Sequence, residues 1–331
     1  MASMEELKVV RVFRALNTMI QLCRDRGYII RHPSAIAEAV QDPALYDPEE
    51  GLDYDWFLHH FVVTPERADS MRAKKNSSSS GSGGGSGAEN KKRRIVKEEQ
   101  DEAEGTDLTE EAEILRRAAN GEWICMRNAM RLSCSLAPGG AGSVPAPGVT
   151  KVPLTTAASV VKKEKEEDDG AMTAAEAAKA AKNALMVFFS GESKLTMKEV
   201  QACREKAMKK KASSIIMVVN RVEPGVRLDV QELSGRMDEL TGEALLTIQI
   251  FEEEALAFNV VRHETVPHHA ALSEADAQAF LDAHKLNISQ LPRMLESDPL
   301  VQYLGLQRGS VVHITREGKQ GRPYSMYRHV I

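Results

Sequence analysis

The chain has few of the residues that build cross-linked or membrane-embedded proteins. Its 4 cysteines are Cys23, Cys125, Cys134 and Cys203, and no two of them form a C-x-x-C motif. Neither a disulfide scaffold nor a structural zinc site is therefore predicted. No apolar run approaches the roughly 18 residues of a membrane span, and no signal-peptide core follows the first residues. We expect a soluble intracellular protein with no membrane partner.

Apolar residues are also somewhat scarce, at 42% of the 331 residues, against roughly 45–50% in compact domains. This shortfall predicts that part of the chain has no core. The net charge of −5 excludes a wholly basic nucleic-acid binder, so any contact with nucleic acid must be local.

Two stretches have the composition of disordered insertions. The first, at 76–121, begins with the Ser/Gly run NSSSSGSGGGSGAEN and continues into the basic run at 91–94, which resembles a nuclear import signal. The second, at 137–182, is rich in Ala, Gly and Pro and contains a block of mixed charge. Between them, 122–136 alternates roughly and is predicted to contain a strand.

The remainder of the N-terminal part is more regular. Apolar residues spaced by three or four predict a helix over Glu5–Arg26, closed by Gly27. Tyr28–Ile30 follows as a short extended segment, and Ser34 is placed to cap a second helix.

The apolar runs ALMVFF at Ala184–Phe189 and SIIMVV at Ser214–Val219 are typical of buried strands. A helix over Thr196–Lys211 lies between them, and this strand, helix, strand order indicates a parallel pair and an α/β domain. Thr247–Val261 is expected to supply a further strand or two.

The last part of the chain has a different pattern. A helix is predicted from Ser273 to about Lys285, and Asp298-Pro299 marks another helix start. Ser310–Thr315 and Tyr324–Val330 are separated by turn residues and predict a β-hairpin. This module is therefore expected to be α+β.

Motifs of catalysis are scarce. No P-loop, dinucleotide-binding or G-x-S-x-G motif is present. His263 and His268, with Glu264, are the tightest candidates for a metal site. Their spacing of five, broken by Pro267, instead favours turn histidines bonded to backbone. Cys203 beside a basic residue could be a reactive thiol, but a buried helical cysteine is the commoner case.

Basic residues give a stronger signal. A run of lysines at the end of the helix at 196–211 either complements the helix dipole or faces DNA. In the C-terminal hairpin region, five basic residues and one acid lie between Arg308 and Arg328, with tyrosines among them. Arginine and tyrosine are enriched at protein interfaces, and the alternative is a solvated face of the hairpin.

These features come together in a resemblance to one family. The segments that carry it are Val261–His268 (VRHETVPH), Leu291-Pro-Arg293, Asp298-Pro299, Tyr303-x-Gly305, Arg308-Gly-x-Val-Val312 and Tyr327-Arg-x-Val330. They resemble the fifth common subunit of eukaryotic nuclear RNA polymerases, a family that also has an archaeal member. The segment QLCRDRGY at Gln21–Tyr28 resembles the first helix and turn of the eukaryotic protein.

The resemblance implies an α/β N-terminal jaw domain, made of 1–75, 122–136 and 183–255, and an α+β C-terminal assembly domain at 256–331. It implies a non-catalytic nuclear subunit that docks on the largest polymerase subunit and other core subunits, with the jaw near downstream duplex DNA. No cofactor, metal or small-molecule substrate is implied. The predicted partner-binding residues are Pro292, Arg293, Asp298, Pro299, Tyr303, Arg308, Tyr327 and Arg328. The predicted DNA-proximal residues are Lys206, Lys209, Lys210, Lys211 and Pro224.

The sequence departs from the family in three places besides the insertions. The loop at 191–193 lacks the family's proline, and the loop around Pro224 keeps only that proline of a Thr-Pro-Ser-Ala motif. His313 stands where a lysine is common. Two alternatives follow: a stand-alone metal-dependent nucleic-acid enzyme, or a family variant restricted to one polymerase or with a regulatory role outside it.

Overall fold

The computed structural model describes residues 4–31, 34–48, 50–71, 113–118, 120–136, 184–191, 194–234, 246–318 and 321–331. The insertion predicted at 137–182 lies outside these ranges, and so do the basic run at 91–94 and most of the insertion predicted at 76–121. Within the described ranges, no helix is long and apolar enough to cross a lipid bilayer.

A five-stranded sheet forms the centre of the N-terminal part, with strand order β1-β6-β7-β8-β9. The strands are β1 (Tyr28–Ile30), β6 (Leu132–Leu136), β7 (Ala184–Phe189), β8 (Ser214–Val219) and β9 (Thr247–Glu252). β7, β8 and β9 run parallel, whereas the β1–β6 and β6–β7 pairs are antiparallel. The predicted parallel pair is confirmed, and the fold is mixed α/β.

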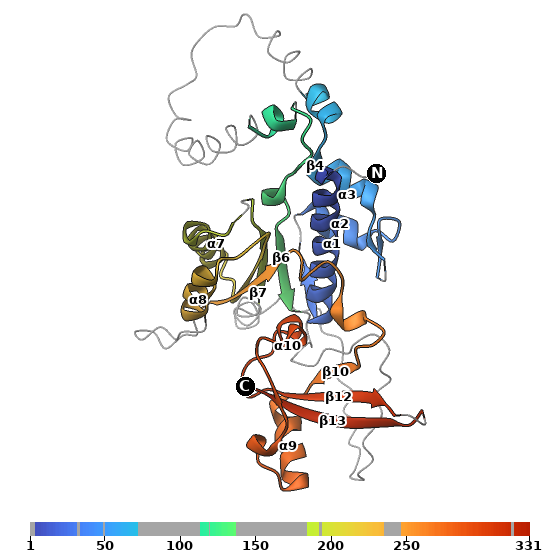
Figure 1. Ribbon diagram of the computed structural model, residues 1–331, viewed down its shortest axis with the longest axis vertical. Helices are drawn as coiled ribbons and strands as arrows, with labels where there is room; N and C mark the ends of the chain where they lie inside the picture. The colour runs from blue at the N-terminus through green and yellow to red at the C-terminus, as the bar shows by residue number, and fades with distance from the viewer. Residues whose placement is uncertain are drawn as a thin grey trace, which may run out of the picture.

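Helices cover both faces of this sheet (Figure 1). On one face, α1 (Met4–Asp25) buries Leu16 and Ile20 in a cluster with Val187 of β7. On the other face, α7 (Met197–Lys209) and α8 (Pro224–Leu233) pack in a cluster that contains Met186. Because successive strand residues point to opposite faces, a strand covered on both sides must be apolar throughout. This explains the two uninterrupted apolar runs.

A series of short elements follows β1 along the chain. They are α2 (Ala35–Gln41), the hairpin of β2 (Tyr46–Asp47) and β3 (Gly51–Leu52), and α3 (Tyr54–Phe61). The hydroxyl of Ser34 accepts a hydrogen bond from the Ala37 backbone N–H, so Ser34 caps α2 as predicted.

The region predicted to hold one strand at 122–136 holds two. β4 (Val62–Val63) pairs with β5 (Ile124–Cys125), and after the 3-10 turn η1 (Arg127–Ala129) the chain enters β6 in the main sheet. Two helical segments, at 65–71 and 113–118, bury Ala68 and Leu115 against each other beside β4. The helical segment at 113–118 was not predicted from the sequence.

The second strand considered within Thr247–Val261 is absent. After β9 the chain forms turns and the 3-10 helix η2 (Val260–Arg262). These turns contact α1 through their side chains, and their backbone adds no strand to the sheet.

The C-terminal part is a four-stranded sheet with strand order β10-β12-β13-β11. Its strands are β10 (His268–Ala271), β11 (Arg293–Met294), β12 (Val311–Glu317) and β13 (Pro323–Val330), with the short turn η3 (Ile288–Gln290) before β11. β12 and β13 form the predicted antiparallel hairpin. The helices α9 (Glu274–His284) and α10 (Pro299–Leu304) pack on opposite faces, because the first shares a cluster with Val311 and the second with Val312.

Candidate assembly and DNA-facing surfaces

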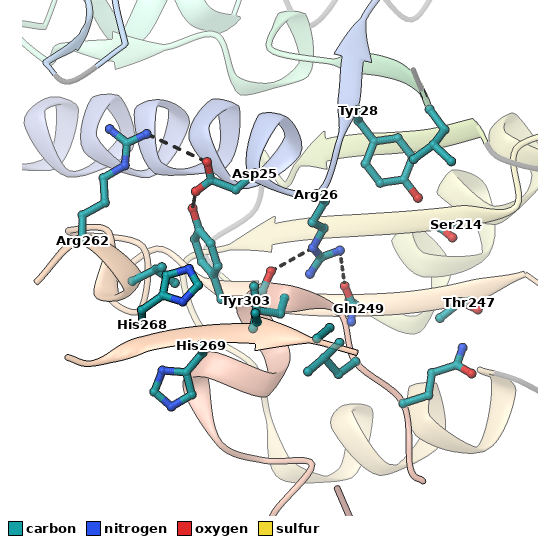
Figure 2. A pocket seen from close by; sticks show the side chains of 18 of the residues that line it. Asp25, Arg26, Tyr28, Ser214, Thr247, Gln249, Arg262, His268, His269 and Tyr303 are labelled. Carbon is teal, nitrogen blue, oxygen red and sulfur yellow. Dashed lines mark hydrogen bonds and ion pairs between the residues drawn. The ribbon is translucent and has the colours of Figure 1, made fainter. Parts of the chain in front are cut away.

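Arg26 connects the two parts of the molecule (Figure 2). Its guanidinium donates from Nε to the Tyr303 carbonyl (2.8 Å), from Nη2 to the Gln302 carbonyl (2.7 Å) and from Nη1 to Oε1 of Gln249 (2.9 Å). The two carbonyls belong to the last turn of α10, where a cation is favoured. The Gln302 carbonyl also accepts from the Gly305 N–H (3.1 Å). One side chain thus links the end of α1, strand β9 and α10.

Gly305 makes this contact possible. It ends α10 with φ +68°, and a Cβ at this position would lie 2.9 Å from Cζ of Arg26. A side chain would therefore be strained by the left-handed backbone and would also displace the guanidinium. Burial lowers the pKa of Arg26, which stays protonated because an arginine pKa begins above 12.

Tyr303 forms a second link between the two parts. Its hydroxyl donates to Oδ2 of Asp25 (2.6 Å) and accepts from Nδ2 of Asn259 (2.8 Å), which also donates to Gln21 (3.0 Å). Burial and the neighbouring Asp25 carboxylate raise the pKa of Tyr303, so the phenol is neutral. The side chain is only 4% exposed. The hydrogen-bond partners of its hydroxyl therefore lie within this chain, and the predicted contact of Tyr303 with another chain stays a prediction.

Four other predicted partner-binding residues have positions that the fold accounts for. Asp298 caps α10 by accepting from the Leu300 N–H, and Pro299 is the first residue of that helix. The ring of Tyr327 stacks on Phe280, with centroids 3.8 Å apart, and also faces His313. Arg328 is partly buried on β13 opposite Val312. None of these contacts tests a role in binding a partner.

The remaining predicted residues lie at one end of the C-terminal sheet, which we call the β11 edge. Its exposed members are Pro292, Arg293, Leu295, Glu296, Arg308 and Ile331. Leu295 is 60% exposed and Ile331 36% exposed, and they are brought near each other because the Ile331 carbonyl accepts from the Glu296 N–H. Arg308 pairs with Glu296 at 2.9 Å. The edge is thus an exposed apolar pair surrounded by charge.

The predicted DNA-proximal residues do not lie together. The four lysines are exposed at the end of α7, just before β8 begins, whereas Pro224 follows the end of β8. The six residues of β8 span about 20 Å. The lysines therefore lie at the amino edge of the parallel strands and Pro224 at the carboxyl edge.

The carboxyl edge has its own basic residues. Lys194, after β7, pairs with Glu223 beside Pro224 at 2.9 Å, and Arg221 is exposed between them and β8. Nearby, Gly191, Asn220 and Glu253 follow the ends of the three parallel strands and line a cavity of about 890 Å³. Clefts at this edge are the usual ligand sites of open α/β sheets.

This cavity is surrounded by cations that were not predicted from the sequence: Lys8, Arg11, Arg117 and Arg127. Arg127 forms a buried pair with Glu253 (2.7 Å), and burial raises the pKa of that carboxyl despite the nearby cation. The other three cations pair with acids at exposed positions, where ion pairs contribute little and exchange readily.

The histidines and cysteines have ordinary structural environments. His263 bonds Thr265, whereas His268 and His269 lie on strand β10, which corrects the expectation that they are turn residues. The described part of the chain contains no group of three or more residues that could hold a metal ion. Cys203 is buried in α7, and burial raises the pKa of its thiol, which confirms the prediction of a buried helical cysteine.

The comparisons with known proteins first identify the family that the C-terminal domain resembles. Residues 258–330, which include the whole four-stranded sheet, match the family model described as RNA polymerase Rpb5, C-terminal domain. The predicted resemblance is confirmed for this domain.

The particular relatives are subunits RPABC1 of DNA-directed RNA polymerases I, II and III. The Caenorhabditis elegans and Caenorhabditis briggsae proteins are each 29% identical to this chain over 148 residues, which is 44% of this chain and 66% of theirs. The Dictyostelium discoideum protein is 29% identical over 147 residues, or 44% of this chain and 71% of its own length. The chain is therefore homologous to this subunit, and the match spans just under two thirds of the nematode relatives.

Proposed function

We propose that this chain is a non-catalytic subunit of a nuclear DNA-directed RNA polymerase. The match of residues 258–330 to the Rpb5 C-terminal domain carries the proposal. Homology to the RPABC1 subunits supports the same role for the chain as a whole. Its partners are other polymerase subunits, and phosphodiester bond formation takes place on those chains.

In this proposal the C-terminal sheet is the assembly domain, and the β11 edge docks on the largest subunit. Exposed Leu295 and Ile331 provide an apolar centre, with Arg293 and Arg308 at its rim. Interfaces commonly have this composition, with an apolar core, arginine enrichment and a polar border. Tyr303 is excluded from this surface because it is buried at the junction.

The N-terminal module is proposed as a jaw domain near downstream DNA. Its carboxyl edge is the better candidate for the contact, because Lys194, Arg221 and the cations around the cavity lie there together with Pro224. Basic side chains that contact phosphates give weak, salt-dependent binding that does not depend on sequence. The four lysines of α7 face away from this edge.

Assembly is tested by a double substitution at the β11 edge, Arg293→Ala with Leu295→Asp. Placing a carboxylate in the apolar centre should reduce recovery of the largest subunit by about tenfold or more, because one buried unpaired charge costs several kcal/mol. The measurement is quantitative mass spectrometry of a native affinity purification. The control is Leu228→Asp on α8, where the leucine is 62% exposed. Equal recovery from both variants would refute the docking surface.

The DNA contact is tested by comparing two matched pairs of substitutions. Lys194→Ala with Arg221→Ala removes two charges from the carboxyl edge, and Lys209→Ala with Lys210→Ala removes two from the amino edge. Binding of the full chain to a short duplex is followed by fluorescence anisotropy at several salt concentrations. The first pair should weaken binding and reduce the salt slope by about 2, whereas the second should change neither. A loss confined to the second pair contradicts the proposed orientation.

A further inference from the structure

Strand β10 has one unpaired side among the described residues. It lies at the edge of the C-terminal sheet and pairs only with β12. The backbone N–H of Leu272 donates to the Val311 carbonyl (3.0 Å), and the direction of these groups alternates along an antiparallel strand. The N–H and carbonyl groups of His269 and Ala271 therefore point away from β12.

This free side lies along a cavity of about 560 Å³ between the two parts of the molecule. Figure 2 shows β10, with His268 and His269, on one side of the cavity, and Tyr28, Ser214 and Thr247 of the N-terminal module across from it. The end of α10 and the residues that follow it line the cavity as well. The unpaired strand is thus set back from the outer surface.

The edge has none of the side chains that usually block an exposed strand. The sequence of β10 is HHAA, with no proline, lysine or carboxylate, although natural edge strands are commonly blocked by such residues. Burial lowers the pKa of His269, so its ring is neutral near pH 7, and Nδ1 bonds the Pro267 carbonyl at 2.6 Å. The strand thus offers free main-chain donors and acceptors that no blocking side chain covers.

We propose that β10 pairs with a single extended segment of another polymerase subunit, which adds a fifth strand to the sheet. Main-chain hydrogen bonds would provide the affinity, as in other cases of strand addition. The four residues of β10 allow contact over about 13 Å. The identity of the partner rests on the proposed function, whereas the pairing itself rests on the geometry of the edge.

The surroundings specify the chemistry of the segment. The N-terminal module faces β10 across the cavity, so a second folded sheet has no room to approach and only an isolated strand fits. The cations at the cavity already have partners, since Arg26 makes three hydrogen bonds and Arg262 bonds the Pro48 carbonyl (2.7 Å). The nearby residues include Gly305 and Ser214. The geometry therefore favours small, uncharged side chains.

The test compares Ala271→Pro with Ala271→Val. Proline removes the N–H that points into the cavity and no bond to β12, and such a position tolerates proline in an edge strand. Valine keeps the donor and the strand conformation. Recovery of the other polymerase subunits should fall about tenfold for the proline variant and stay unchanged for the valine variant, with both chains equally folded by circular dichroism.

Hydrogen exchange provides the independent readout, because it does not depend on the variant folding. The amides of His269 and Ala271 should exchange rapidly in the free chain and at least tenfold more slowly in the purified polymerase, whereas the Ala270 amide should be protected in both. Unchanged exchange within an assembled polymerase would overturn the strand pairing and leave the proposed function intact. Failure to co-purify with any polymerase subunit would overturn both.

One further outcome identifies a different occupant. If the His269 and Ala271 amides are already protected in the free chain, and become exposed when residues 140–180 are deleted, the chain's own segment pairs with β10. That result would also overturn the proposal.

Discussion

The two sheets of the molecule differ in how completely the chain covers them. In the five-stranded sheet, β7 and β8 each bury all but their first residue between α1 on one side and α7 and α8 on the other. In the four-stranded sheet, the clusters on the two faces are small, and the first three residues of β13 are exposed.

This difference indicates two sources of stability. The N-terminal module has a large core of its own. The C-terminal module is too small to bury much apolar surface, and small domains usually need additional support. The contacts of Arg26 and Tyr303 provide part of that support from within the chain. Binding to a partner would add the rest, because a ligand of the folded state stabilises it.

The largest effect on stability is expected from Arg26→Ala, which breaks the contacts of this side chain between the two modules. The change removes the guanidinium donor from the Tyr303 carbonyl and from the Gln302 carbonyl, which keeps only the Gly305 N–H. Lost hydrogen bonds to a charged group cost about 1.5–3 kcal/mol. Amides in β12 and β13 should exchange about ten- to a hundredfold faster, whereas those in β7 and β8 should change little. The control is Arg24→Ala, two residues earlier, whose exposed side chain lies over the ring of Tyr46 and makes no contact with α10. Equal acceleration in both sheets would show that the two modules unfold together.

Much of the fold was predictable because local pattern and tertiary environment agree. The long periodic helix α1 and the strands β7 and β8 were found, since burial on both faces forces an unbroken apolar run. α8 was missed because its Pro-Gly start resembles a loop and only Val226 and Val230 mark its buried side. The segment at 113–118 was missed because the contact with Ala68 that stabilises it is distant in sequence.

The junction was not predictable from residue types. Arginine and tyrosine are enriched at interfaces, but this tendency does not distinguish a contact within the chain from one with another chain. Arg26 and Tyr303 meet across 277 positions of sequence. By contrast, the separation of the lysines at the end of α7 from Pro224 could have been deduced from the predicted parallel crossover, because a crossover helix ends where the next strand begins. These residues were nevertheless predicted together as DNA-proximal.

A change of pH is expected to have a smaller effect on the free energy of unfolding, and this effect has opposite sign in the two modules. Burial lowers the pKa of His269 and His313, so the unfolded state binds protons first as the pH falls through about 6.5, and the C-terminal module loses stability. Burial raises the pKa of Glu253. That carboxyl is protonated first in the folded state, so it stabilises the N-terminal module as the pH falls toward about 4.5.

The contribution of the histidines can be measured in one experiment. Denaturation between pH 7.5 and 5.5 is followed by tryptophan fluorescence for the N-terminal module, where Trp56 and Trp123 both lie, and by hydrogen exchange in β12 for the C-terminal module. Only the exchange should depend strongly on pH, and the double variant His269→Gln with His313→Gln should reduce that dependence. A pH dependence that persists in the double variant would contradict the assignment to these histidines.

The smallest effect is expected from removing residues 138–182 and joining the ends by a short Asn-Gly turn. Ser135 of β6 lies opposite Ala184 of β7 in an antiparallel pair, so the whole insertion occupies the position of a hairpin loop. The entropic cost of closing a loop grows only slowly with its length. Shortening it should leave the fluorescence transition unchanged or raise the free energy of unfolding by about 1–2 kcal/mol.

A control deletion of 120–131 removes β5 and η1 and should unfold the N-terminal module. Loss of the transition in the first deletion as well would show that the five-stranded sheet depends on the insertion, and that its core is less self-sufficient than the comparison of the two sheets implies.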